Sequence, residues 1–233
     1  MKKALFTLIA LAFSVVSYAQ LIANKTDNKV TLGIDFFSDF QLGTNTNWDP
    51  RGFNQGVGLG LTYNFPLGES SKHTVAVGLG MSSHNYFSYN RILNPYTNDS
   101  LMISESYRDT DGFKRSKLNA TYIEVPMELR FRIKDQVKIG VGFKFGYMLA
   151  AKTKFVGPDY STDNILTDGN GTTIREEHTG VNNLERYAYS ATLRIGWKWV
   201  SAYAAYQFSP VFAVGHFAPV IHPLSVGITF APF

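Results

Sequence analysis

The sequence predicts an all-β fold: a transmembrane, antiparallel, up-and-down β-barrel of about eight strands, with short periplasmic turns and long external loops. Three observations support this prediction. Apolar residues alternate with small or polar residues at a period of two along many segments. Short and long connections alternate between those segments. No long unbroken apolar run follows the first 19 residues, so the mature chain offers no transmembrane helix.

The N-terminus resembles a secretory signal peptide. Lys2 and Lys3 provide a basic start, residues 4–16 an apolar stretch, and Ser17-Tyr18-Ala19 a small-residue cleavage site. The apolar stretch is shorter than the roughly 20 residues that a membrane-spanning helix needs. We therefore expect cleavage after Ala19, which makes residues 1–19 a removed signal peptide and residues 20–233 a single barrel domain.

The first three strands are predicted at residues 30–40, 56–65 and 74–82. In the first strand, Ile34 and Phe36 share one face and Asp35 and Asp39 share the other. In the second and third strands, Val and Leu residues on one face alternate mainly with Gly and Thr on the other. Each strand therefore has one apolar face.

The next three strands, at residues 122–133, 137–152 and 186–199, carry charge on the second face. Glu124 and Glu128 alternate with apolar residues in the fourth strand. The fifth strand sets an apolar face that runs from Val137 to Leu149 against a face that includes Lys144 and Lys152.

Two further strands, at about residues 201–211 and 224–230, complete an even number, which lets the barrel close without an edge exposed to lipid. The last strand ends in Phe230, in phase with Leu224, Val226 and Ile228. Residues 231–233 form a short extension. This ending resembles the C-terminal signature of barrels that the assembly machinery of the outer membrane reads.

The connections alternate in length. Residues 41–53, 89–117 and 157–183 are long, residues 66–72, 134–136 and 200–201 are short, and residues 212–223 are intermediate. All long connections fall on one side of the sheet, as in barrels with short periplasmic turns. They are rich in Asn, Asp, Ser, Thr and Gly, so we expect solvated, mobile loops.

The alternation alone does not say which face meets water, because a soluble barrel of the lipocalin kind shows the same period with the faces exchanged. The many glycines on the polar face favour a narrow interior, since glycine on a water-facing surface would only weaken the strands. Aromatic residues mark both predicted rims: Tyr63, Phe65, Trp197 and Trp199 near the short turns, and Tyr86, Phe87, Tyr147, Tyr187 and Phe208 near the long loops.

Residues 121–131, which include Tyr-Ile-Glu-Val-Pro at 122–126, together with the Gly-alternating strand at 138–147 and Arg194-Ile195-Gly196-Trp197, resemble the PorT-like family of small outer-membrane β-barrels. The resemblance runs over most of the mature chain, although its motifs are short and hydrophobic. It implies an outer-membrane barrel of unassigned activity, in a family with one member in a protein-secretion apparatus.

Charge and composition exclude several classes of protein. Removing Lys2 and Lys3 lowers the formal net charge from +4 to +2, which is too balanced for a nucleic-acid partner. Cysteine is absent, which excludes a disulfide scaffold, thiol chemistry and a lipidated N-terminal Cys.

The main candidate site is a polar cluster inside the barrel, joined by Asp35 and Asp39 of the first strand. The cluster can be interpreted as the lining of a selective lumen or as a packed interior whose buried charges neutralise one another. We favour the packed interior, because a barrel of eight strands has room only for its own side chains. Its predicted members are Glu124, Glu128, Arg130, Arg132, Lys144 and Arg194.

Histidine raises an alternative. His84 follows Ser82 and Ser83 near the external rim, and a Ser–His pair with an acid would suit an outer-membrane lipid hydrolase of the deacylase type. His216 and His222 lack further ligands at metal spacing, and residues 168–171 depart from a calcium-binding loop. We expect no enzymatic activity, no cofactor and no metal.

We therefore predict a non-enzymatic protein of the outer membrane of a diderm bacterium. Its expected partners are outer-membrane lipid, the barrel-assembly machinery during insertion, and an envelope protein or ligand that contacts the loops at 89–117 and 157–183. A narrow small-solute channel is the remaining alternative.

Overall fold

A computed structural model describes residues 29–43, 48–68, 73–96, 102–133, 137–158, 173–213 and 218–231. The predicted signal peptide with its cleavage site at Ala19, the turn at 134–136, the loop at 168–171 and His216 lie outside the described residues.

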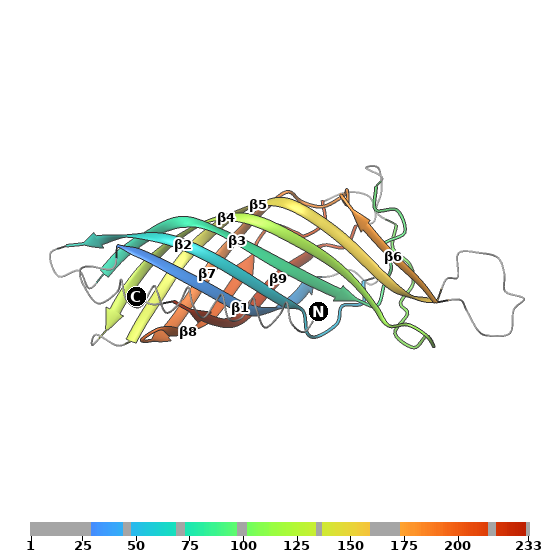
Figure 1. The fold of residues 1–233 in the computed structure, drawn as a ribbon, viewed down its shortest axis with the longest axis horizontal. Helices are drawn as coiled ribbons and strands as arrows, with labels where there is room; N and C mark the ends of the chain where they lie inside the picture. The colour runs from blue at the N-terminus through green and yellow to red at the C-terminus, as the bar shows by residue number, and fades with distance from the viewer. Residues whose placement is uncertain are drawn as a thin grey trace, which may run out of the picture.

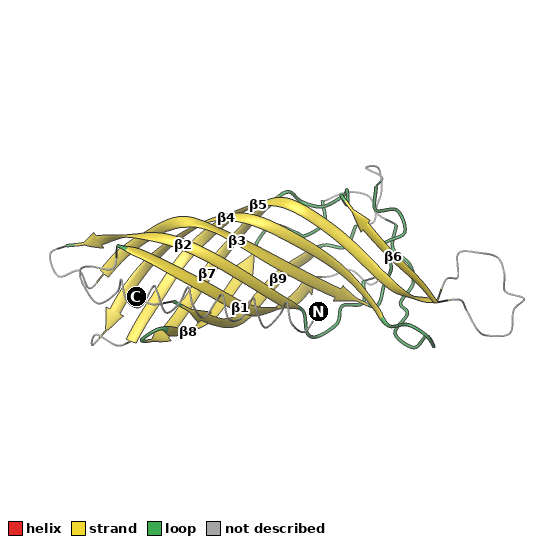
Figure 2. Cartoon of the chain, in the orientation of Figure 1, coloured by secondary structure: helices red, strands yellow, loops and turns green. Residues whose placement is uncertain are grey.

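The described chain consists of β-strands joined by loops and turns (Figure 2). No helix in this part of the chain is long and apolar enough to cross a membrane. The strands are β1 (Val30–Gly43), β2 (Gln55–Leu67), β3 (His73–Ser88), β4 (Arg115–Ile133), β5 (Val137–Pro158), β6 (Thr173–Thr179), β7 (Tyr187–Trp197), β8 (Val200–Gln207) and β9 (Ile221–Phe230).

Eight of these strands form a closed antiparallel ring, which confirms the predicted barrel. Consecutive strands of the ring pair with each other, β5 pairs with β7, and the ring closes where β1 pairs with β9. The ninth strand, β6, lies outside the ring and pairs with the end of β5 (Figure 1). The prediction that residues 157–183 form only a loop was wrong, because β5 continues to Pro158 and β6 follows at 173–179.

The apolar faces point outward. Leu59, Leu79 and Ile195 are more than half exposed, whereas Thr31 and Glu128 on the opposite faces are buried. On β4 the outward apolar residues run from Ile133 to Ile123, which corresponds to a band of about 25 Å for a tilted strand. A soluble barrel would bury these side chains, so the band is the surface that meets lipid.

A β-bulge interrupts β5 at the external edge of this band. The register between β4 and β5 shifts at Thr121/Tyr122, and Leu149 and Ala150 both point outward. Beyond the bulge the faces are exchanged, so Lys152 lies on the outside of the sheet. The prediction that Lys152 shares the interior face was wrong, because an extra residue reverses the alternation that follows it.

Aromatic side chains mark both edges of the band as expected, with one exception. Trp197 and Trp199 are exposed near the short turns, and Tyr187 and Phe208 are exposed near the long loops. Tyr86 was wrongly placed in the external girdle: it is buried inside the barrel, with its ring stacked on that of His84 at 5.9 Å.

The external half of the interior is filled by apolar side chains, many of them from loops. Trp48, Ile92 and Val181, one from each predicted long loop, belong to the same buried cluster as Phe212 and Tyr86. The expectation of solvated loops was therefore wrong for these three side chains. The external end of the barrel is closed by an apolar plug, and polar residues fill the rest.

Candidate functional site

The polar interior contains five of the six predicted cluster residues, in a network whose two halves meet at Tyr203: Lys144 Nζ donates to Tyr203 OH at 3.4 Å, and the Arg194 guanidinium lies 4.8 Å from the centre of the Tyr203 ring. Glu124, Glu128 and Arg130 come from β4, Lys144 from β5 and Arg194 from β7. The sixth, Arg132, is in register with Lys138 at the periplasmic end of β4. No hydrogen bond or ion pair recorded for the described residues joins Arg132 to the network.

The periplasmic half of the network is centred on Arg194. Its guanidinium donates to Asp35 at 3.0 Å and to Thr229 at 3.1 Å, and forms an ion pair with Glu128. Glu128 also accepts from Arg130 Nε at 2.9 Å. Two carboxylates and two guanidinium groups therefore neutralise one another in a narrow space, as buried ions must.

Close backbone approach makes this packing feasible. A Cβ added to Gly142 would lie 2.3 Å from the carbonyl oxygen of Met127 and 2.6 Å from the Glu128 side chain. Any larger residue would push β5 away from β4 or displace the Glu128 carboxylate. Glycine on the inward face thus leaves room for the charged side chains.

The external half of the network is a chain of hydrogen bonds across the barrel. His84 Nδ1 lies 2.8 Å from Asp39 Oδ2, and His84 Nε2 lies 3.0 Å from Ser82 Oγ. Ser82 Oγ in turn donates to Glu124 Oε1 at 2.7 Å, and Lys144 Nζ pairs with the same oxygen at 2.9 Å. Asp39, Ser82 and His84 are almost completely buried.

Ser82 and Asp39 hold the His84 ring from two sides. Ser82 has one hydroxyl hydrogen, which it donates to Glu124, so its oxygen remains available to accept from the His84 ring. The Asp39 carboxylate contacts the other ring nitrogen. Both ring nitrogens therefore have a polar partner inside the barrel.

Within the part of the interior that the structure describes, a small space remains beside the network. A cavity of about 40 Å³ lies beside Asp35, Glu124 and Arg194, where Gly60 leaves open space. This volume suits about three water molecules. Among the described residues, no group of three or more His, Cys, Asp or Glu side chains could hold a metal ion.

Sequence reasoning placed Ser82 on the polar face but left His84 at the external rim. The signal was present, since His84 follows Ser82 by two residues and therefore shares its face. Asp39 was correctly placed with the interior set, but its pairing with His84 links residues 45 positions apart and depends on barrel closure.

Above the plug, the external loops bond to one another and to β6. Arg91 pairs with Glu176 through two hydrogen bonds, and Asn182 Nδ2 donates to Tyr96 O at 2.6 Å. The guanidinium of Arg108 donates to Asp49 and holds the pKa of that carboxyl below its ordinary value. The described loop segments therefore form an ordered cap.

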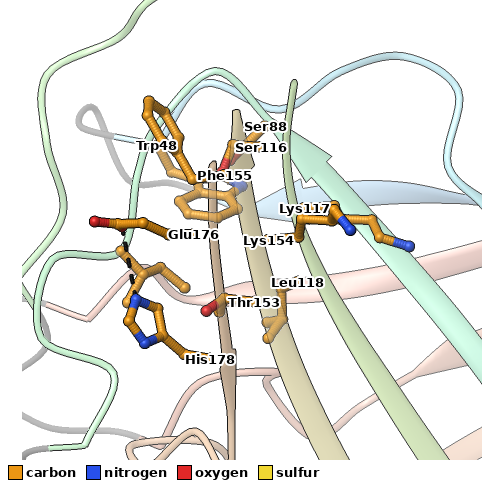
Figure 3. Close-up of a pocket in the computed structure, with 11 residues that line it drawn as sticks. Trp48, Ser88, Ser116, Lys117, Leu118, Thr153, Lys154, Phe155, Glu176 and His178 are labelled. Atoms are coloured by element: carbon orange, nitrogen blue, oxygen red, sulfur yellow. Dashed lines mark ion pairs between the residues drawn. The ribbon is translucent and has the colours of Figure 1, made fainter. Parts of the chain in front are cut away.

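A pocket of about 10 Å³ lies under this cap, with room for about one water molecule. Figure 3 shows Trp48, Phe155, Glu176 and His178 around it, with the Glu176–His178 ion pair marked. It is too small for an organic ligand.

A family model described as outer membrane protein beta-barrel domain matches residues 18–216. The chain belongs to this family. This outer membrane β-barrel protein therefore resides in the outer membrane, as the apolar band predicts. No curated protein matches the chain.

Solved structures similar to this outer membrane β-barrel protein include the attachment invasion locus protein Ail of Yersinia pestis. Its crystal structure has 15% sequence identity and a TM-score of 0.35, covering 87% of this chain and 95% of Ail. Ail in a phospholipid nanodisc has 13% identity and a TM-score of 0.36, covering 86% of this chain and 98% of Ail. A porin of Rh. blastica has 8% identity and a TM-score of 0.21, covering 87% of this chain and 99% of the porin.

Proposed function

We propose that this protein is a non-enzymatic, plugged barrel that anchors a cap of external loops, and that the cap binds an envelope protein or ligand. The observation that carries the proposal is the occupied interior: an apolar plug lies above a network of ion pairs and hydrogen bonds, and the cavity of about 40 Å³ suits only a few waters. The same observation disfavours the narrow-channel alternative. A role as an accessory to secretion or envelope assembly would suit such an anchored cap.

The loop cap offers apolar anchors for such a partner. Phe53, Leu93, Tyr96 and Met102 are each more than 40% exposed on external segments. Exposed aromatic residues commonly dominate the binding energy of protein interfaces.

We expect the double variant Phe53→Ser, Tyr96→Ser to reduce partner capture about tenfold or more, because each aromatic anchor contributes substantially to binding. The measurement is quantitative pull-down of the tagged full chain from detergent-solubilised outer membranes. The control variant Glu105→Gln, Asp111→Asn changes two exposed loop residues and should capture as much as the wild type. Equal capture by the two variants would contradict a partner site on the apolar part of the cap.

The string Asp39–His84–Ser82 gives the lipid-hydrolase alternative a specific basis, since its spacing resembles that of a catalytic triad. Two features oppose it. A nucleophilic serine donates its proton to histidine, whereas Ser82 donates to Glu124 and accepts from His84. The three side chains are also buried inside the barrel, away from the lipid face.

We therefore expect His84→Ala to leave the acyl-chain composition of lipid A unchanged, because His84 serves as a buried hydrogen-bond partner of Asp39. Mass spectrometry of lipid A from the wild-type, His84→Ala and deletion strains is the measurement, with His178→Ala of the external cap as the control. An additional acyl chain in both the His84→Ala and deletion strains would establish the hydrolase instead.

A further inference from the structure

Three strands, β3, β4 and β5, continue past the apolar band at the external end of the barrel, and β6 joins them there to form an external extension of the sheet. The outward apolar residues reach Met81 on β3, Ile123 on β4 and Leu149 on β5, and polar residues follow on each strand. Beyond this level β5 pairs with β6 instead of β7. The ends of β4, β5 and β6 lie together at this end of the molecule (Figure 1).

The bulge at Leu149 and Ala150 determines what this extension presents outward. Beyond it, Ala151, Thr153 and Phe155 turn to the buried side, and Lys152 and Lys154 turn to the outer side. Figure 3 shows Lys117 and Lys154 pointing away from the pocket that Trp48 and Glu176 line. Without the extra residue, the two lysines of β5 would point into the apolar plug.

On the outer side of the extension, basic side chains of neighbouring strands lie next to one another. We call this surface the basic face. Lys117 lies directly opposite Lys154, and Asn119 opposite Lys152. On β6, Glu177 lies opposite Lys154 and Arg175 opposite Val156. The cations of the face are Arg115, Lys117, Lys152, Lys154 and Arg175.

Internal partners neutralise only part of this charge. Lys154 pairs with Glu177 at 3.0 Å, and Lys117 donates to the amide oxygen of Asn85 at 2.9 Å. Glu177 is the one carboxylate on the outward positions of β4, β5 and β6 within this described stretch. Like charges placed opposite each other weaken a sheet. Anions supplied from outside the protein would remove this penalty.

The height of the basic face identifies the source of those anions. Asn119, level with Lys152, is four residues beyond Ile123, and Lys117 is six residues beyond it. At the rise of a tilted strand, the lysines are about 10 to 15 Å above the edge of the apolar band. That is the level of the lipid headgroups, where basic side chains bind anionic lipids.

We propose that the basic face binds the phosphate groups of a phosphorylated glycolipid in the outer leaflet. Lys117 and Lys152 supply the central contacts, Lys154 remains paired with Glu177 beside them, and Arg115 and Arg175 extend the face on the solvent side. The acyl chains of the same lipid lie against Met81, Ile123 and Leu149 directly below. The site is separate from the loop cap and does not depend on the proposed partner.

The test compares binding of bisphosphorylated lipid A and its dephosphorylated form to the detergent-solubilised, folded full chain. We expect the wild type to prefer the phosphorylated lipid by about 10- to 30-fold, and Lys117→Gln, Lys152→Gln to lose that preference. The control Lys29→Gln, Lys198→Gln removes the same charge at the periplasmic end and should retain the preference. Circular dichroism and heat-modifiable gel mobility verify that each variant is folded.

Three outcomes would overturn the proposal. Equal affinity of the wild type for both lipids would remove the role of phosphate. If the test and control variants lost the preference for phosphorylated lipid equally, the preference would depend on the net charge of the protein and not on the basic face. Soluble polyphosphate that displaces the lipid at equal phosphate concentration, and binds as tightly on its own, would assign the face to a soluble polyanion.

Discussion

Arg194→Met should lower the free energy of unfolding by about 3 to 5 kcal/mol, the typical cost of removing one partner from a buried ion pair. Arg194 bonds to Asp35, Glu128 and Thr229, and methionine fills a similar volume without satisfying any of them. Two carboxylates would then share the interior with fewer cations. Urea titration of the barrel reconstituted in lipid vesicles measures the change.

A paired substitution separates charge from packing. Arg194→Met combined with Asp35→Asn removes one cation and one of its anions together, so the combined loss should be smaller than the sum of the single losses. Arg194→Lys, which keeps the charge but not the fork of donors, should fall between the wild type and Arg194→Met. Strictly additive losses in the double variant would show that the Arg194–Asp35 pair contributes no coupling.

Leu129→Arg should cost about 2 to 4 kcal/mol, because it places a cation near the middle of the lipid-facing band. Leu129 is 46% exposed on β4, between Ile123 and Ile133 at the two edges of the band. The matched substitution Ile133→Arg lies at the periplasmic edge, where the cost should fall to about 0 to 1 kcal/mol. The same vesicle titration measures both, and equal costs at the two depths would contradict the assigned position of the bilayer.

Alternation was sufficient to predict most of the barrel. Period-two patterning predicted the faces of the strands correctly wherever the alternation was uninterrupted, so Glu128 and Arg194 were expected on the inside before their contact was known. Predicted strand boundaries were less accurate, and β6 was missed because its short sequence shows no clean apolar face. Its pairing with the far end of β5 is a tertiary effect.

Neither the bulge nor the plug could be predicted from the sequence, for two different reasons. Residues 147–151, Tyr-Met-Leu-Ala-Ala, are all apolar, so the change of face at Leu149 and Ala150 leaves no trace in the pattern. The plug brings Leu184 and Phe212 from two loops into one buried cluster with Tyr86, and single apolar residues in loops that are polar on average do not stand out in the sequence. Only the closed barrel brings these residues together.

The seam between β1 and β9 has a consequence for how the chain reaches its final state. Ser225 and Thr229 of the last strand donate to Asp39 and Asp35 of the first strand, both at 2.5 Å. Until those strands meet, four groups that are partners in the finished protein remain separated by almost the whole length of the chain. A partly inserted chain that has not joined its two ends thus leaves polar groups unsatisfied, which favours completing the ring over persisting as an open sheet.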